Sequence, residues 1–219
     1  MVDAIAIGRK IYANLKKAIQ YIISIHIPLI LTVFMPLILG WVYPNIFSPV
    51  HVIFFELIMG PTCSIVYENE PMEKNAMLRP PRPHTSTFFN WKELGTSVIQ
   101  GLVITIGTLA VYQFSVAGGY GEIATRSMIF LTLITANIFL TLVNRSFHYS
   151  IIATLKNRNN MVPAVILTTI AITAALFLIK SLAAFFSLGQ LSLCQVLIST
   201  GVGFLSVIWY EAVKWNKRS

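Results

Sequence analysis

The residues with the clearest capacity for chemistry lie in one apolar stretch, residues 49–67. Glu56 stands about eight residues into it, and an ionisable group inside a membrane-spanning segment is by default a functional candidate. Pro61 has no amide hydrogen, so the carbonyl of Leu57 loses its donor, and Gly60 stands beside it. A carboxylate beside a freed carbonyl offers two oxygen ligands, as in the broken helices of ion transporters. A protonated Glu56 that is hydrogen-bonded for packing is the alternative.

Other polar side chains within apolar stretches could contribute to such a site. Thr62 and Cys63 follow the proline, and Cys63 lies seven residues after Glu56, on the same helix face. His26 could carry a proton or bind a cation, although a buried, neutral histidine fits equally well. Asn137 is a second candidate, but an intramembrane asparagine more often joins helices than binds an ion. Three prolines are expected to kink helices and free carbonyl groups: Pro28, Pro36 and Pro61.

The sequence contains none of the motifs of a self-sufficient enzyme. There is no P-loop, no glycine-rich phosphate loop, no GxSxG and no HExxH. The two cysteines, Cys63 and Cys194, have neither the CxxC spacing nor the paired histidines of a metal motif. We therefore expect no catalytic residue and no cofactor site in this chain.

The composition indicates that the solvent of this chain is a lipid bilayer. Of the 219 residues, 56% are hydrophobic and 11% are charged, with a mean hydropathy of +0.73, whereas about a quarter of a soluble domain is charged. The net charge of +8 does not predict a nucleic-acid partner, because the basic residues lie in short segments between apolar runs. That pattern is typical of membrane topology.

Six apolar runs are long enough to cross a hydrocarbon core, which needs roughly 20 helical residues. They comprise residues 19–42, 49–67, 94–116, 127–143, 162–179 and 193–213. Basic residues accumulate in every second connection, and the positive-inside rule places those connections in the cytoplasm. The sequence thus predicts an all-α integral membrane protein, a six-helix transmembrane bundle with cytoplasmic N- and C-termini. We divide it into a cytoplasmic lead-in (1–18), a transmembrane domain (19–213) and a cytoplasmic tail (214–219).

Two further motifs resemble those of a known family. The first is the run from Gly8 to Lys17, GRKIYANLKK, and the second is Leu78-Arg79-Pro80-Pro81-Arg82. In this order, about 70 residues apart with two helices between them, they are similar to the carboxy-terminal membrane region of P-type cation-transporting ATPases, in the calcium-pump-like branch. The resemblance implies that the six helices correspond to the family's helices five to ten, and that Arg79, Pro80, Pro81 and Arg82 form the loop between helices six and seven.

The resemblance also implies positions for cation ligands. His26 falls at a ligand asparagine of calcium pumps, Leu29 at a ligand glutamate, Glu56 at a second asparagine, and Gly60 at the aspartate shared between ions. Met59 replaces a threonine, and Asn137 falls at the helix-eight acid. Two carboxylate ligands of the calcium-pump pattern are therefore missing from this sequence, and one carboxylate stands at a new position. The pattern favours a different cation, a single ion or protons, with Glu56 as the main charged ligand.

The sequence has no Asp-Lys-Thr-Gly phosphorylation site and no nucleotide-binding domain, so ATP and Mg²⁺ are implied for a complete pump and not for this chain. A fragment, a truncated reading frame and a split gene whose partner supplies the amino-terminal half all remain open. The alternatives to a pump are a stand-alone, partner-binding membrane subunit and a secondary transporter or channel that uses Glu56 and His26. The expected location is the plasma membrane, in a bacterium the inner membrane.

Overall fold

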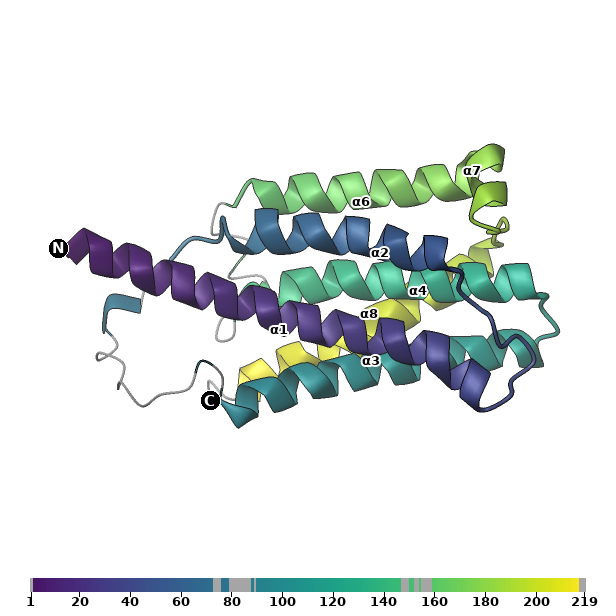
Figure 1. The fold of residues 1–219 in the computed structure, drawn as a ribbon, viewed down its shortest axis with the longest axis horizontal. Coiled ribbons are helices and arrows are strands. Elements are labelled where there is room, and N and C mark those ends of the chain that lie inside the picture. Colours follow the sequence, from purple (N-terminus) through teal and green to yellow (C-terminus); the bar gives the residue numbers. More distant parts are fainter. Residues whose placement is uncertain are drawn as a thin grey trace.

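The computed structural model of the chain is a bundle of helices (Figure 1). It describes residues 2–72, 76–78, 88, 90–146, 150–151, 154 and 159–216, without the side chains of Cys63 and Ser64. Six helices of this described part have the length and apolar composition of membrane spans. These are α1 (Val2–Ile38), α2 (Pro49–Pro61) with its π-helical continuation η1 (Thr62–Tyr67), α3 (Trp91–Ala117), α4 (Glu122–Val143), α6 (Met161–Leu178) and α8 (Leu193–Asn216). Two short elements are η2 (Ala76–Leu78) and α7 (Lys180–Phe185). The predicted all-α, six-helix membrane fold is confirmed.

The first helix is longer than the apolar run that predicted it. α1 begins at Val2 and projects beyond the rest of the bundle, so the lead-in and the first span form one continuous helix (Figure 1). Pro28 and Pro36 both lie inside this helix. It ends where Gly40 adopts a positive φ of 62° and the amide of Trp41 donates to the Pro36 carbonyl at 2.9 Å, as in a Schellman cap.

Close helix packing depends on two glycines. A Cβ added to Gly203 of α8 would lie 2.7 Å from the carbonyl oxygen of Thr132 in α4. One added to Gly101 of α3 would lie 2.7 Å from the Cβ of Ile27 in α1. Small residues allow helix backbones to approach in this way inside membranes. They hold together the two most extensive helix pairs of the bundle, α4 with α8 and α1 with α3.

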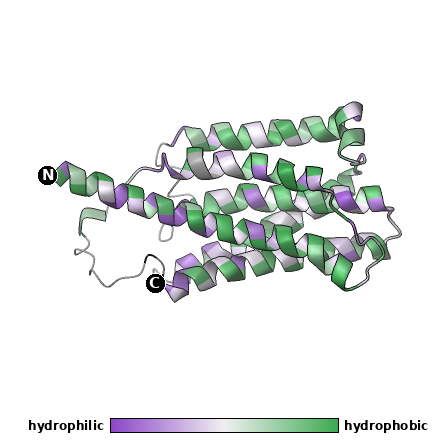
Figure 2. Cartoon of the chain, viewed as in Figure 1, coloured by the Kyte–Doolittle hydropathy of each residue, from purple (hydrophilic) through white to green (hydrophobic). Residues whose placement is uncertain are grey.

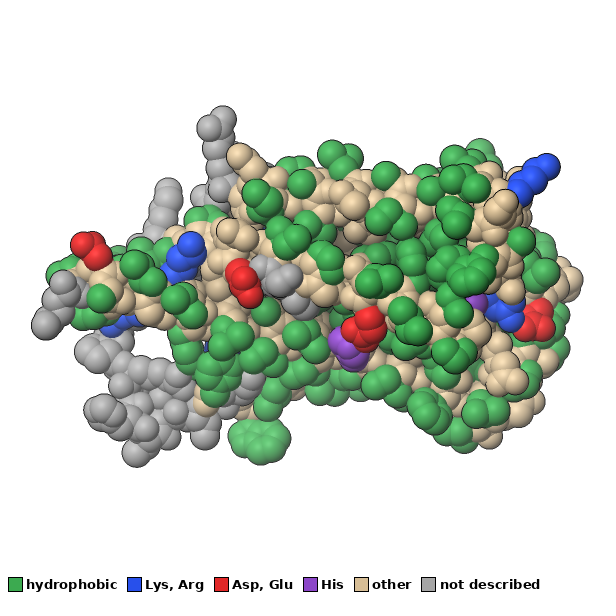
Figure 3. Space-filling model, turned by 45° about the horizontal axis from the view of Figure 1, so that its top comes forward, with side chains coloured by type: hydrophobic (Ala, Val, Ile, Leu, Met, Phe, Trp, Pro, Cys, Tyr) green, Lys and Arg blue, Asp and Glu red, His purple; other side chains and the backbone are tan. Residues whose placement is uncertain are grey.

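The outward surface of the bundle is largely apolar, while many polar side chains lie inside it (Figures 2 and 3). Serine and threonine hydroxyls in the buried set bond mainly to carbonyls one helical turn earlier, as Thr105, Thr132 and Thr141 do at 2.8 Å. An apolar outer surface, with the polar groups hydrogen-bonded inside the bundle, is suited to contact with lipid. The N- and C-termini lie at the same end of the bundle, as an even number of spans requires (Figure 1). That this end is cytoplasmic stays a prediction.

Candidate cation-binding site

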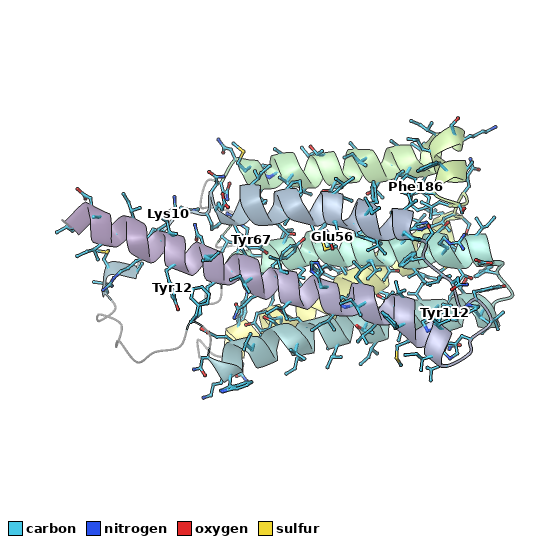
Figure 4. The ribbon with its side chains drawn as sticks, in the orientation of Figure 1. Lys10, Tyr12, Glu56, Tyr67, Tyr112 and Phe186 are labelled. Carbon is cyan, nitrogen blue, oxygen red and sulfur yellow. The ribbon has the colours of Figure 1, made fainter. Side chains whose placement is uncertain are left out.

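Two of the residues singled out in the sequence, His26 and Glu56, form a pair between the first two helices. The ring nitrogen Nε2 of His26 lies 2.9 Å from the carboxylate oxygen Oε1 of Glu56. The other ring nitrogen, Nδ1, lies 2.8 Å from the carbonyl of Ile22, one turn earlier in α1. Glu56 thus lies between α1 and α2, midway along the bundle (Figure 4).

The hydrogen bonds of His26 determine where protons must lie. A carbonyl oxygen accepts hydrogen bonds and cannot donate them, so Nδ1 carries a proton and donates it to Ile22. Nε2 and the Glu56 carboxyl are then joined by one further proton, which belongs either to the ring or to the carboxyl group. Both arrangements leave the pair with no net charge, which lowers the cost of placing a carboxyl group inside a membrane.

The pair lies on an apolar face of the molecule. Its side chains are 32% and 50% exposed, for His26 and Glu56 respectively. Figure 3 shows a histidine and an acidic side chain next to each other on a face of mostly hydrophobic side chains. Exposed apolar residues within four positions of the pair in sequence include Ile22, Ile53 and Leu57. An ionised, unpaired acid at the bilayer centre would be unfavourable by about 3 kcal/mol, and the neutral pair still exposes polar atoms on this face. This face therefore needs water, a bound cation or further polar groups around the pair.

The helix changes its geometry one turn after Glu56. Pro61 offers no amide hydrogen to the Leu57 carbonyl, and the α-helix gives way to a π-helix from Thr62 onward. The amide of Thr62 instead bonds to the Met59 carbonyl. Gly60 is exposed, and a Cβ added there would meet nothing within 4 Å. The break expected from the sequence takes the form of a change of helix type, with open space beside it.

The other sequence candidates are not brought to this pair by the described hydrogen bonds. Thr62 is buried, and its hydroxyl donates to the Ile58 carbonyl at 3.2 Å. Asn137 accepts a short hydrogen bond from the Tyr21 hydroxyl, and the Tyr21 and Tyr67 rings lie 5.3 Å apart between their centres. Asn137 therefore links α4 to α1, as an interhelical asparagine does. The side chain of Cys63 lies outside the described residues.

The two family-like motifs differ in how far the structure describes them. Arg79, Pro80, Pro81 and Arg82 lie outside the described residues. The first motif lies in α1, where Arg9 donates to the Ala76 carbonyl at 2.7 Å and Tyr12 donates to the Phe88 carbonyl at 2.8 Å. The projecting part of α1 thus contacts the connection that holds the second motif.

A buried polar network, which the sequence analysis missed, lies at the end of the bundle that carries the termini. Arg145, just after α4, forms an ion pair of 3.0 Å with Glu70, just after η1, and these side chains are only 2% and 4% exposed. Asn159 donates to the second carboxylate oxygen of Glu70 at 2.9 Å and to the Val66 carbonyl at 3.0 Å. Asn14 of α1 donates to the Glu70 carbonyl at 2.8 Å. The network joins the end of η1 to three other parts of the bundle.

The part of the chain that the structure describes has no group of three or more histidine, cysteine, aspartate or glutamate side chains able to hold a metal ion. The His26–Glu56 pair supplies two such ligands. Any further ligands would be backbone carbonyls, water or groups outside the described residues.

Comparison with known proteins places the chain in a family. Residues 44–216 match the family described as "Cation transporting ATPase, C-terminus". The chain is 26% identical over 98% of its length to "Calcium-transporting ATPase 1" of Lactococcus lactis, and 26% identical over 67% of its length to a calcium-transporting ATPase of Listeria monocytogenes. These alignments cover 24% and 16% of the two relatives, so the chain spans a quarter or less of their length. The chain belongs to the cation-transporting P-type ATPases and corresponds to their carboxy-terminal transmembrane region.

Proposed function

We propose that this chain forms the ion-binding membrane region of an ATP-driven cation pump, in which His26 and Glu56 bind the transported cation. The observation that carries the proposal is the contact of 2.9 Å between an imidazole and a carboxyl group on adjacent membrane helices. Pro61 supports the proposal, because a proline has no amide hydrogen to donate to the Leu57 carbonyl, and the helix changes type directly after it.

The length and course of α1 support a role in coupling. This one helix runs from Val2, outside the rest of the bundle, to His26 in the candidate site. A displacement of its projecting end would therefore reach the ion ligands through a continuous backbone. In the proposed pump that end follows a phosphorylation domain, and ATP and Mg²⁺ are used by the amino-terminal part of the pump.

The proposed setting is a lipid bilayer, in bacteria the inner membrane, since the relatives named above are bacterial proteins. The proposed partners are the transported cation and the amino-terminal part of the pump, whether it lies in the same polypeptide or in a separate chain.

The test is formation of an acid-stable phosphoenzyme from labelled ATP by the chain together with its amino-terminal part. We expect cations to change the phosphoenzyme level and Glu56→Gln to weaken that cation dependence, because the amide keeps the size of the side chain but loses its charge. The matched control is Glu68→Gln, at an exposed carboxylate beyond the end of η1, which should leave the dependence unchanged.

Unchanged cation dependence in Glu56→Gln would remove Glu56 from the site. If no phosphoenzyme forms, the pump proposal is wrong, and a partner-binding membrane subunit becomes the better interpretation. Cation flux through the purified chain in liposomes without ATP would instead support a secondary transporter or channel.

A further inference from the structure

We propose that the His26–Glu56 pair selects a divalent transition-metal cation of the Zn²⁺ and Co²⁺ type over Ca²⁺. The proposal rests on the proposed function, because it uses the same two side chains as ligands, and it extends that function by naming the class of cation. It departs from the relatives, whose names describe calcium transport.

The first argument is the chemistry of the two ligands. Ca²⁺ is bound by six to eight oxygen atoms, whereas imidazole nitrogen together with carboxylate oxygen suits Zn²⁺ and its neighbours in the transition series. His26 Nε2 and Glu56 Oε1 lie 2.9 Å apart. Two ligand bonds of about 2.0–2.1 Å place their ligand atoms about 2.9 Å apart when they meet at a right angle and about 3.4 Å apart at a tetrahedral angle. The pair therefore already has the spacing of two neighbouring ligands of one such ion.

The second argument is the orientation of the histidine ring. A metal-bound histidine almost always donates its second ring N–H to a carboxylate, carbonyl or water, which fixes the tautomer that presents the other nitrogen to the metal. Nδ1 of His26 makes this bond, to the Ile22 carbonyl at 2.8 Å. Nε2 consequently points its metal-binding side at Glu56.

The third argument is the low number of carboxylates available for Ca²⁺. Within the described residues, four other glutamates are paired with a lysine or arginine, in the pairs Lys16–Glu93, Arg126–Glu122, Arg145–Glu70 and Lys214–Glu211. Glu68 is exposed beyond the end of η1, twelve residues after Glu56. Glu56 differs, because its partner is an imidazole and it lies in the interior of a span. One carboxylate and one nitrogen make a poor calcium site and a reasonable part of a zinc or cobalt site.

The fourth argument is the space around the pair. Gly60 lies one turn after Glu56, and a Cβ added there would meet no side chain and no other helix within 4 Å. Glu56 and Leu57 are also exposed, at 50% for the side chain of Glu56 and 67% for Leu57. Water molecules or groups from a neighbouring helix can therefore complete the coordination of an ion held by the two side chains.

The experiment measures binding of the metals alone to the purified 219-residue chain in lipid nanodiscs. Three further side chains that could bind metal are first removed, in a background that carries His84→Gln, His148→Gln and Cys194→Ser. Zn²⁺ and Ca²⁺ affinities are determined by competition with chromophoric indicators, and Co²⁺ binding is followed by its visible absorption bands, which report nitrogen and oxygen ligation. The variants are His26→Gln and Glu56→Gln, with Glu68→Gln as the matched control.

We expect saturable binding of one Zn²⁺ or Co²⁺ ion, tighter than that of Ca²⁺ by about tenfold or more, and a loss of about tenfold or more in each site variant but not in the control. Circular dichroism of each variant shows whether the helices are retained.

Three results would overturn the inference. Tighter binding of Ca²⁺ that depends on Glu56 would refute the choice of metal and leave the proposed function intact. Zn²⁺ binding that is unchanged in His26→Gln would show that the metal binds elsewhere. No saturable binding of either cation would refute both the inference and the assignment of these residues as ligands.

Discussion

Breaking the buried Glu70–Arg145 ion pair by removing one partner should be one of the most destabilising single changes in the bundle. Arg145 makes three nitrogen-to-oxygen contacts of 3.0–3.2 Å with the Glu70 carboxylate. Replacing Arg145 by methionine leaves a glutamate side chain of 4% exposure without its counter-charge. Removing one partner of a buried pair typically costs about 3–5 kcal/mol. We expect Arg145→Met to lower the free energy of unfolding in mixed micelles of detergent and dodecyl sulfate by that amount.

A double-mutant cycle separates the pair from its surroundings. The double variant Glu70→Met/Arg145→Met removes both charges, so it should lose less stability than the sum of the two single variants. The matched control is Lys16→Met, which breaks a partly exposed pair of 2.7 Å with Glu93 and should cost about 1 kcal/mol or less. Strict additivity of the two single changes, or a loss in Arg145→Met no larger than in Lys16→Met, would refute the reasoning.

Three further predictions concern packing, helix geometry and topology. Gly203→Ala should destabilise the bundle by about 1–3 kcal/mol in the same unfolding assay, because the added Cβ would lie 2.7 Å from a carbonyl oxygen of α4, whereas Gly201→Ala, which meets nothing within 4 Å, should not. Pro61→Ala restores an amide donor one turn after Glu56, and we expect it to alter the cation dependence of phosphoenzyme formation; wild-type dependence would argue against a role for the helix change. A cysteine placed at the exposed residue Asn45 should react with a membrane-impermeant thiol reagent only from outside, and one placed at the exposed residue Asn160 only from the cytoplasm. The opposite pattern would show that the topology is inverted.

The number and type of the helices could be predicted from the sequence because each span needs about 20 apolar residues, and that requirement is local. The ends of α1 could not be predicted in the same way. Its start at Val2 lies among charged residues that a helix tolerates outside lipid, and its end is set by the backbone of Gly40. The sequence alone also does not show which of two adjacent asparagines is accessible to a labelling reagent, since Asn159 is buried against Glu70 whereas Asn160 is exposed.

The sequence could predict the individual residues of the candidate site but not the contact between them. His26 and Glu56 were each visible as ionisable groups in apolar runs, but their contact depends on how α1 and α2 are placed against each other. The Glu70–Arg145 pair joins residues 75 positions apart, and nothing in the local sequence around either residue indicates that it is buried. Asn137 was visible as an intramembrane amide, and its bond to Tyr21 agrees with the role that such residues most often have.

The side chain that each glutamate is paired with indicates whether its carboxylate has a structural or a functional role in this molecule. Glu70 and Glu122 are paired with arginine, whose guanidinium stays charged and cannot bind a cation. The Glu70–Arg145 pair joins separate elements of the bundle, and the Glu122–Arg126 pair lies within the first turns of α4. Glu56 is instead held by a histidine, which can lose its ring proton and become a metal ligand itself. If a cation replaced the proton that His26 and Glu56 share, both side chains would bind the cation. Of these pairs, His26–Glu56 lies in the interior of a span and is partly exposed, so an ion could bind there without breaking the buried Glu70–Arg145 contact that joins the helices.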